Sequence, residues 1–230
     1  VIDEDGNIYL IGTAFLTTPC NCPKVLKVSS EGAILWATYY EYPEWGTHRY
    51  RGRQLFLTDS ETLILAALGL PGPSIDQLEA RYEWFIEIDL EGEVIQEMVL
   101  QNHNLSSFFG YQHVAYYGNK ELLLGGIHNE EGEPRLLRIN VVPQETIFSV
   151  SNPGPGAIGQ LFLVFPDGRF GHIHRDFSRL EEPEIQLATY YSDGDLCQTV
   201  GIDEYYLERP FSAIVKEDSS ILMAGEFTTS

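Results

Sequence analysis

Residues that could bind a ligand gather most densely in the segment 41–52. Within seven positions it carries an indole, an imidazole and two guanidinium groups, at Trp45, His48, Arg49 and Arg51. The chain has only 14 Lys and Arg among its 230 residues, so this cluster of positive charge is unusual for it. Aromatic rings provide stacking area, and a guanidinium donates two parallel hydrogen bonds. The segment therefore suits a carbohydrate, a peptide or a carboxylate.

A later segment adds two residues of the same kinds, His103 and Tyr111. The plainer alternative is that all these aromatic rings pack over the ends of strands and that the arginines pair with nearby glutamates. The two interpretations differ in one observable way. A recognition surface requires Trp45 and Arg51 to be exposed and to converge, whereas the packing alternative buries them.

Glutamine recurs at a second set of candidate positions. Gln54, Gln112 and Gln160, together with Ser212, each lie six residues before a turn position, at 60, 118, 166 and 218. This spacing predicts that they occupy one equivalent site and form a partial ring of amides. Such a ring suits a polar ligand, and the alternative is that each amide satisfies neighbouring backbone groups.

Metal-binding signals are weak. His172 and His174 share one face of a predicted strand, but no third ligand has a fixed spacing to them. Cys20 and Cys22 lie two apart in a predicted loop, where a direct disulfide is strained. Cys197 lies in a predicted strand and is expected to be a small buried side chain. We therefore predict no metal site.

The elements that must position these residues form an internal repeat. A unit of about fifty residues recurs four times and a fifth copy begins, with steps of roughly 50 to 60 residues. Each unit reads strand, tight turn, strand, longer loop, strand, tight turn, strand. The first turns are Glu4-Asp5-Gly6, Asp59-Ser60-Glu61, Gly118-Asn119-Lys120, Pro166-Asp167-Gly168 and Glu217-Asp218-Ser219.

Alternation of apolar and polar residues predicts four strands in each unit. We predict one array over 1–230, with units at 1–50, 51–109, 110–157 and 158–209 and a partial unit at 210–230. The first strands are expected at 54–58, 112–117, 160–165 and 212–216; the second at 7–15, 62–68, 121–127, 169–174 and 220–227; the third at 25–28, 84–88, 135–139 and 185–190; the fourth at 33–40, 93–100, 145–150 and 195–201.

Small residues near the end of the second strand, Gly12, Ala67, Gly126 and Gly225, suit close packing of one sheet on the next. The first unit also carries a recognisable pattern. It reads Asp5-Gly6-Asn7-Ile8-Tyr9-Leu10-Ile11-Gly12, followed by Leu26-Lys27, Gly32 and Trp36. In this pattern the chain resembles the kelch-like β-propellers of secreted bacterial proteins.

That resemblance implies an all-β fold, a β-propeller of four-stranded antiparallel blades. Later units replace Trp36 with Gln96, Phe148 and Gln198, so they are divergent repeats. The chain holds five first hairpins and four second hairpins, which is about four and a half blades. Because an incomplete blade leaves unpaired edges, we expect these residues to be part of a larger propeller of about six to eight blades.

Loop lengths point to one end of the blades as the binding end. The connections within the two hairpins of each unit are expected to be tight turns of two to four residues, whereas the other connections are expected to be long. In a four-stranded meander these two sets lie at opposite ends. Binding residues concentrate on long loops held by a rigid scaffold.

Charge and composition exclude several partners. The formal charge is −20, from 14 basic and 34 acidic residues, so binding to a phosphate backbone is disfavoured and no nucleic-acid partner is expected. The chain has no apolar run of 18 residues, so no membrane insertion is expected. An acidic surface suits an extracellular or cell-surface protein, with the periplasm as an alternative.

Motifs for catalysis and cofactors are missing from the sequence. It has no P-loop, dinucleotide-binding fingerprint, nucleophile elbow or His-Glu-x-x-His motif, and we predict no cofactor. We therefore expect a non-catalytic propeller that binds a protein or glycan through its loop-rich face. The alternatives are a glycoside hydrolase or lyase, which needs two carboxylates across the channel, and a structural scaffold in a secreted or outer-membrane-associated assembly.

Overall fold

The computed structural model describes residues 1–15, 21–41, 49–70, 81–102, 113–127, 134–141, 145–151, 158–176, 184–202 and 209–226. For some strand residues next to the gaps it describes the backbone alone. The described residues form antiparallel strands joined by turns, as the alternating pattern predicts. Among them, no helix has the length and apolar character needed to cross a membrane.

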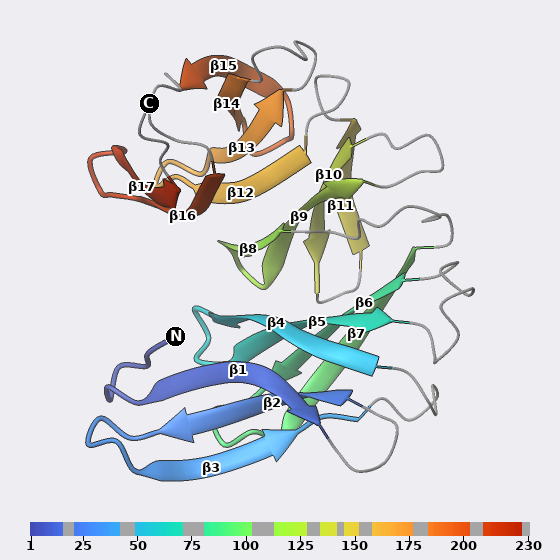
Figure 1. The fold of residues 1–230 in the computed structure, drawn as a ribbon, viewed down its shortest axis with the longest axis vertical. Helices are drawn as coiled ribbons and strands as arrows, with labels where there is room; N and C mark the ends of the chain where they lie inside the picture. Colours follow the sequence, from blue (N-terminus) through green and yellow to red (C-terminus); the bar gives the residue numbers. More distant parts are fainter. Residues whose placement is uncertain are drawn as a thin grey trace. The chain divides into compact units, whose positions relative to one another are not determined.

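The described residues form five sheets that follow one another along the chain, and in each the strands lie in sequence order (Figure 1). The chain divides into two compact units, Val1–Gly110 with Gly118–Lys120, and Tyr111–Tyr117 with Glu121–Ser230. Sheet 1 contains β1 (Ile8–Phe15), β2 (Asn21–Val28) and β3 (Ile34–Tyr39), and sheet 2 contains β4 (Arg49–Leu57), β5 (Leu63–Leu70), β6 (Arg81–Ile88) and β7 (Val94–Asn102).

The remaining sheets follow the same plan. Sheet 3 contains β8 (His113–Gly118), β9 (Glu121–Ile127), β10 (Pro134–Asn140) and β11 (Glu145–Ser151). Sheet 4 contains β12 (Ile158–Val164), β13 (Phe170–Asp176), β14 (Glu184–Tyr190) and β15 (Leu196–Ile202), and sheet 5 contains β16 (Arg209–Val215) and β17 (Ile221–Glu226). The predicted order of strands and the split into hairpins are confirmed.

Several strands begin earlier than predicted. β2 starts at residue 21 instead of 25, β4 at 49 instead of 54, and β6 at 81 instead of 84. The reason is that each pairs with a partner along its whole length, so the ladder of backbone hydrogen bonds continues into residues whose side chains do not alternate. The connections at that end therefore span fewer residues than expected, and β2 begins six positions after the last residue of β1, as β5 does after β4.

The hairpin turns share one closing geometry. In sheet 1 the backbone N–H of Ser29 donates to Ala33 O at 2.8 Å and that of Gly32 donates to Ser29 O at 2.9 Å. The turns 89–93 and 191–195 repeat both bonds. The fourth residue after the strand has a positive φ, 87° at Gly32, 91° at Gly92 and 94° at Gly194, which glycine adopts without strain. These turns therefore keep the backbone conformation that the sequence repeat encodes.

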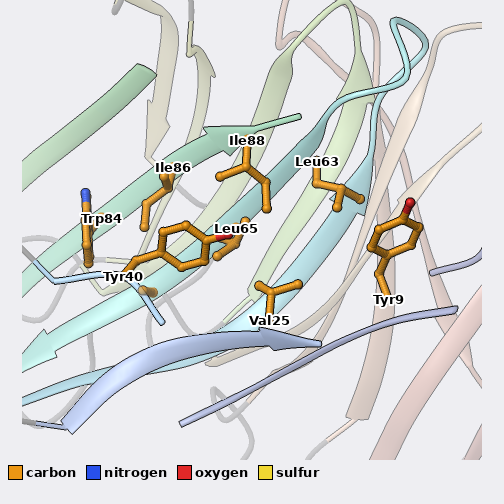
Figure 2. Packing of buried hydrophobic residues seen from close by; sticks show 9 residues of the cluster. Tyr9, Val25, Tyr40, Leu63, Leu65, Trp84, Ile86 and Ile88 are labelled. Carbon is orange, nitrogen blue, oxygen red and sulfur yellow. The ribbon is translucent and has the colours of Figure 1, made fainter. Parts of the chain in front are cut away.

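The core of the first unit lies between sheets 1 and 2 (Figure 2). Tyr9 and Val25 from sheet 1 and Tyr40, just after it, face residues from β5 and β6 of sheet 2. The sheet 2 residues are Leu63, Leu65, Ala67, Trp84, Ile86 and Ile88, all at most 1% exposed. Each large side chain buried here stabilises the fold by about 1.5–3 kcal/mol. This packing holds the two sheets in a fixed register.

Glycine permits the closest approach within the first unit. A Cβ atom added to Gly52 of β4 would lie 2.5 Å from Gly12 O and 2.8 Å from Ile11 Cγ1. A Cβ atom added to Gly12 would meet nothing within 4 Å. Close packing was expected to require a small residue at Gly12. The structure instead places that requirement on Gly52, because the backbone carbonyl of Gly12 is the group that it approaches.

The second unit has a core on each face of sheet 4. One contains Leu123 and the aromatic residues Phe162, Phe170 and Tyr190, with the rings of Phe170 and Tyr190 stacked at 5.2 Å between centroids. The other packs Phe165 and Ile173 against side chains of sheet 5, among them Ala213, Val215, Ile221 and Met223. Burial raises the pKa of Tyr190 to about 12. Sheet 4 is therefore covered on both sides.

Candidate functional site

The candidate binding end of the first unit is the end of sheets 1 and 2 that is opposite the hairpin turns. The Nζ atom of Lys27, close to the turn of sheet 1, donates to Leu90 O in the equivalent turn of sheet 2 at 3.1 Å. The turn ends of the two sheets therefore lie together. Because consecutive strands are antiparallel, the longer connections 42–48 and 71–80 leave from the other end.

Most of the predicted binding residues cannot be placed individually. Trp45, His48, His103, Tyr111 and Gln112 lie outside the described residues, so their predicted convergence stays a prediction. Arg49 lies in β4 and Gln160 in β12, each described by its backbone alone. Arg51 and Gln54 are described in full, and both lie in β4. Arg51 is exposed and Gln54 is half-buried.

The register of the hairpins corrects part of the predicted amide ring. Counting back from the first closing bond of each turn, at Thr58, Phe165 and Lys216, places Gln54 level with Leu161 and Ser212. Gln160 lies one position earlier, at an irregularity in the pairing of β12 with β13. Gln54 and Ser212 are thus equivalent, but Gln160 is not. Spacing along the sequence missed this because the turn 165–169 was aligned one residue out of step.

The first strands of sheets 2, 4 and 5 share this irregularity in pairing, and it affects the candidate site. β4 shifts register between Gly52 and Gln54, β12 between Gly159 and Leu161, and β16 between Pro210 and Ser212. A bulge of this kind leaves one residue unpaired and reverses the alternation of faces beyond it. In β4 the extra residue at the register shift is Arg53. The repeat therefore conserves this local distortion among its own copies.

In β4 the bulge brings Arg51 and Gln54 to the same face of the sheet. Arg51 pairs with Leu68 and Gln54 pairs with Ala66, whereas Gly52 and Leu55 pair with Ala67 and Leu65. Ala67 and Leu65 belong to the core shared with sheet 1. Arg51 and Gln54 therefore lie on the opposite face of sheet 2. Without the bulge, residues three apart in a strand would point to opposite faces.

A buried carboxylate belongs to the same face. Glu83 of β6 pairs with Leu68, so it lies in the same row across the sheet as Arg51. It is 1% exposed. A row that runs from an exposed guanidinium to a buried carboxylate, with an amide one row away, can recognise a ligand that has both donors and acceptors. Our sequence reasoning missed Glu83, although an acid directly beside Trp84 in an apolar strand was the available signal.

The pattern that carried the resemblance has a packing role in this structure. Tyr9 OH donates to Asp3 Oδ2 at 2.9 Å, and Lys27 Nζ lies 5.4 Å from the centre of the Tyr9 ring. Trp36 Nε1 donates to Leu90 O at 3.1 Å, the same carbonyl that accepts from Lys27. Burial alone would lower the pKa of Lys27, but hydrogen bonds with Tyr9 and Glu91 outweigh it and raise that pKa. These residues fasten sheet 1 to the turn of sheet 2.

In sheet 2, Glu87 occupies the strand position that Lys27 occupies in sheet 1, so an acid stands where sheet 1 has a base. Its side chain is fully buried, and Oε1 lies 2.7 Å from Lys120 Nζ and accepts from Thr62 Oγ1 at 2.7 Å. Gln96 also donates to Glu87. Burial alone would raise the pKa of Glu87, but the hydrogen bonds from Lys120, Thr62 and Gln96 outweigh it and lower that pKa. Glu87 is therefore a structural ion-pair partner.

The histidine and cysteine candidates are placed as follows. His172 is buried in β13 and its ring stacks on Phe162 at 4.8 Å, whereas the side chain of His174 is not described. Cys22 is buried in β2 instead of lying in a loop, and Cys20 lies outside the described residues. Among the described side chains, no group of three His, Cys, Asp or Glu is arranged to hold a metal ion.

Cys197 was expected to be a small buried hydrophobic residue, and the structure contradicts this. The side chain is half-buried in β15 and has polar neighbours. A hydrogen bond with Tyr191 lowers the pKa of the Cys197 thiol, and Arg169 and Thr189 contribute in the same direction. The Arg169 guanidinium also pairs with Asp167 at 2.7 Å.

Comparison with known proteins identifies the fold and nothing finer. A scan against protein-family models finds no match, and no curated protein matches the chain. Among solved structures, virginiamycin B lyase from Staphylococcus aureus aligns with a TM-score of 0.57 and 11% identity, over 99% of this chain and 67% of that one.

Two further solved structures align with similar scores. The Dos1 propeller has a TM-score of 0.56 and 10% identity, over 89% of this chain and 50% of that one. A puromycin hydrolase mutant has a TM-score of 0.52 and 12% identity, over 97% of this chain and 34% of that one. This chain therefore spans half of the Dos1 chain and about a third of the hydrolase chain. With its meandering antiparallel sheets, the chain has a β-propeller fold.

Proposed function

We propose that this protein is a non-catalytic, kelch-like propeller of the secreted bacterial type that binds a protein or a glycan at the loop end of its sheets. The observation that supports this most directly is the β4 bulge, because it sets Arg51 and Gln54 on one face of sheet 2, the face that also carries Glu83. Arg51 is the exposed member, so it is the one that can meet a ligand first. Trp45, His48, Arg49, His103 and Tyr111 are proposed to extend the same surface.

The chemistry of the three described groups defines the ligand. A guanidinium donates in a fixed fork to a carboxylate or to a pair of hydroxyl groups, and the Gln54 amide both donates and accepts. Stacking of an aromatic residue such as Trp45 on a sugar ring or a peptide side chain would add contact area. An extracellular or cell-surface location is part of the proposal, and the net charge of −20 supports it through solubility.

The binding proposal is tested with the purified chain on a glycan array and a surface-displayed peptide library. Ligands recovered with the unmodified chain should be lost in the double variant Trp45→Ala with Arg51→Ala. Lys216→Ala is the matched control, because Lys216 is an exposed cation in the hairpin turn of sheet 5, away from the loop end of that sheet. Thermal stability should change by no more than about 0.5 kcal/mol in either variant. Binding that survives the double variant, or unfolding caused by it, rejects this surface.

An enzyme is the second candidate, and buried Glu83 is the observation that favours it. Virginiamycin B lyase and puromycin hydrolase are enzymes by name and share the fold. A carboxylate 1% exposed in the row of Arg51 has the setting of a general acid or base. If the chain turns over a polysaccharide ligand found on the array, Glu83→Gln should abolish turnover while leaving binding intact, and the non-catalytic proposal is then wrong.

A further inference from the structure

Sheet 1 covers sheet 2 through a defined set of contacts. On sheet 2 the covered face consists of Leu63 and Leu65 of β5 and of Ile86 and Ile88 of β6, all fully buried. Beside it, the turn after β6 offers Leu90 O and the Glu91 carboxylate to Lys27 of the covering sheet, each at 3.1 Å. The docking face therefore combines an apolar surface with one carbonyl and one acid.

The second unit uses the same arrangement. Arg138 of β10 lies just before a register shift, as Lys27 of β2 does. It donates to Ser192 O, in the turn after β14, which is the position equivalent to Leu90. A cation in the strand next to the last of one sheet, β2 or β10, thus donates to the turn carbonyl of the following sheet in both units. The same contact therefore recurs at equivalent positions of the repeat.

Sheet 1 presents an equivalent docking face that is exposed. Counting from the turn bonds, Ile8 and Leu10 are equivalent to Leu63 and Leu65, yet they are 37% and 50% exposed. The turn of sheet 1 has the same hydrogen bonds and the same positive φ at glycine as the turn of sheet 2. Ser30 and Glu31, equivalent to Leu90 and Glu91, are both exposed.

We propose that this face of sheet 1 is the docking surface for a further propeller blade. That blade carries Lys or Arg in the strand equivalent to β2 and β10, before the register shift, and the cation donates to Ser30 O and pairs with Glu31. A second copy of this chain fits less well. Of its four equivalent positions, Lys27 and Arg138 are already engaged, Glu87 is an acid and Thr189 is uncharged. The blade is therefore one that the described sheets do not include.

The test adds a second copy of sheet 1, because sheet 1 already packs on the equivalent face of sheet 2. A second copy of residues 1–48 is placed ahead of residue 1 in the full chain, so that its own Lys27 can reach Ser30 and Glu31. Leu10→Cys is then introduced in the original copy, and alkylation at that position is followed by peptide mass spectrometry. We expect alkylation to slow at least about tenfold relative to the single chain carrying Leu10→Cys. Glu93→Cys, exposed in a turn of sheet 2, is the matched control and should react equally in both chains.

Charge variants identify the contact. In the tandem chain, Glu31→Lys in the original copy should restore fast alkylation of position 10. Adding Lys27→Glu in the other copy re-forms an ion pair of opposite polarity, and alkylation should become slow again. Equal alkylation of position 10 in the two chains overturns the proposal, and so does a tandem chain that circular dichroism shows to be unfolded. Slow alkylation in the single chain, together with a dimer by light scattering, would mean that a second copy covers the face instead.

Discussion

At the scale of single residues, the polar groups of the two units work mainly between strands and sheets. Lys27 is 7% exposed and serves a carbonyl, a carboxylate and an aromatic ring at once. Glu87 collects three donors in a fully buried position. In the sequence Lys27 was one member of the repeat pattern and Glu87 was one acid among many, and neither pattern named their partners. Lys120, the partner of Glu87, lies roughly thirty residues from it along the chain, and Leu90 and Glu91 lie roughly sixty residues from Lys27. Local spacing in the sequence therefore could not reveal these partners.

Lys27→Met should lower the free energy of unfolding by about 1–2 kcal/mol, because Leu90 O loses its charged donor while the apolar stem of the side chain is kept. Urea denaturation at pH 7 measures the difference. Lys24→Met is the control, since Lys24 lies in the same strand and is exposed, and it should change stability by no more than about 0.5 kcal/mol. Equal effects of the two substitutions would contradict the fastening role of Lys27.

Glu87→Gln should weaken the protein at neutral pH by about 2 kcal/mol, because Lys120 loses its charged acceptor. The pKa of Glu87 is lowered from 4.5, so the stability that its charge provides is present above pH 4.5 and is lost as the pH falls through the lowered value. Stability measured from pH 7 to pH 3 should therefore fall less steeply for the variant. Glu93→Gln, which changes an exposed acid, should keep the steep slope of the unmodified protein.

At the scale of elements, the close contact between β1 and β4 depends on one missing side chain. Gly52→Ala forces a Cβ against Gly12 O and Ile11, and the backbone must move, at a cost of about 1–3 kcal/mol. Gly12→Ala introduces a Cβ that meets nothing within 4 Å, so it should be tolerated. Denaturation midpoints of the two variants give the comparison. A larger loss for Gly12→Ala would show that the sheets pack differently.

At the scale of the whole molecule, net charge is the dominant electrostatic feature. With a formal charge of −20, the acidic side chains repel one another in the compact state, and added salt screens that repulsion. The melting temperature should therefore rise by several degrees between about 20 mM and 500 mM NaCl, a range over which the screening length falls several-fold. Reversing three exposed acids, Glu31, Glu61 and Glu217, to Lys changes the charge by +6, to −14, and should reduce the rise. A melting temperature that falls with salt would argue that ion pairs outweigh repulsion.

The sequence by itself determined the order of the strands, their pairing into hairpins and the turns between them. These features depend on alternation and on turn residues only a few positions apart, such as Gly32 and Gly92, and local chemistry is enough to specify them. It also indicated the propeller fold, because the same unit recurs. Arg51 and Gln54 could be singled out by residue type, but not the face on which they lie.

Only the tertiary structure decided that face and the members of the site. The β4 bulge reverses the alternation after Arg53, and a reversal of one residue is invisible to a pattern that counts positions. Pairing of β6 with β5 then brings Glu83 into the row of Arg51. The contacts of Lys27 and the exposure of Ile8 and Leu10 likewise follow from which sheets pack together. Packing between distant segments sets all of these, and it is not written in any local stretch of the chain.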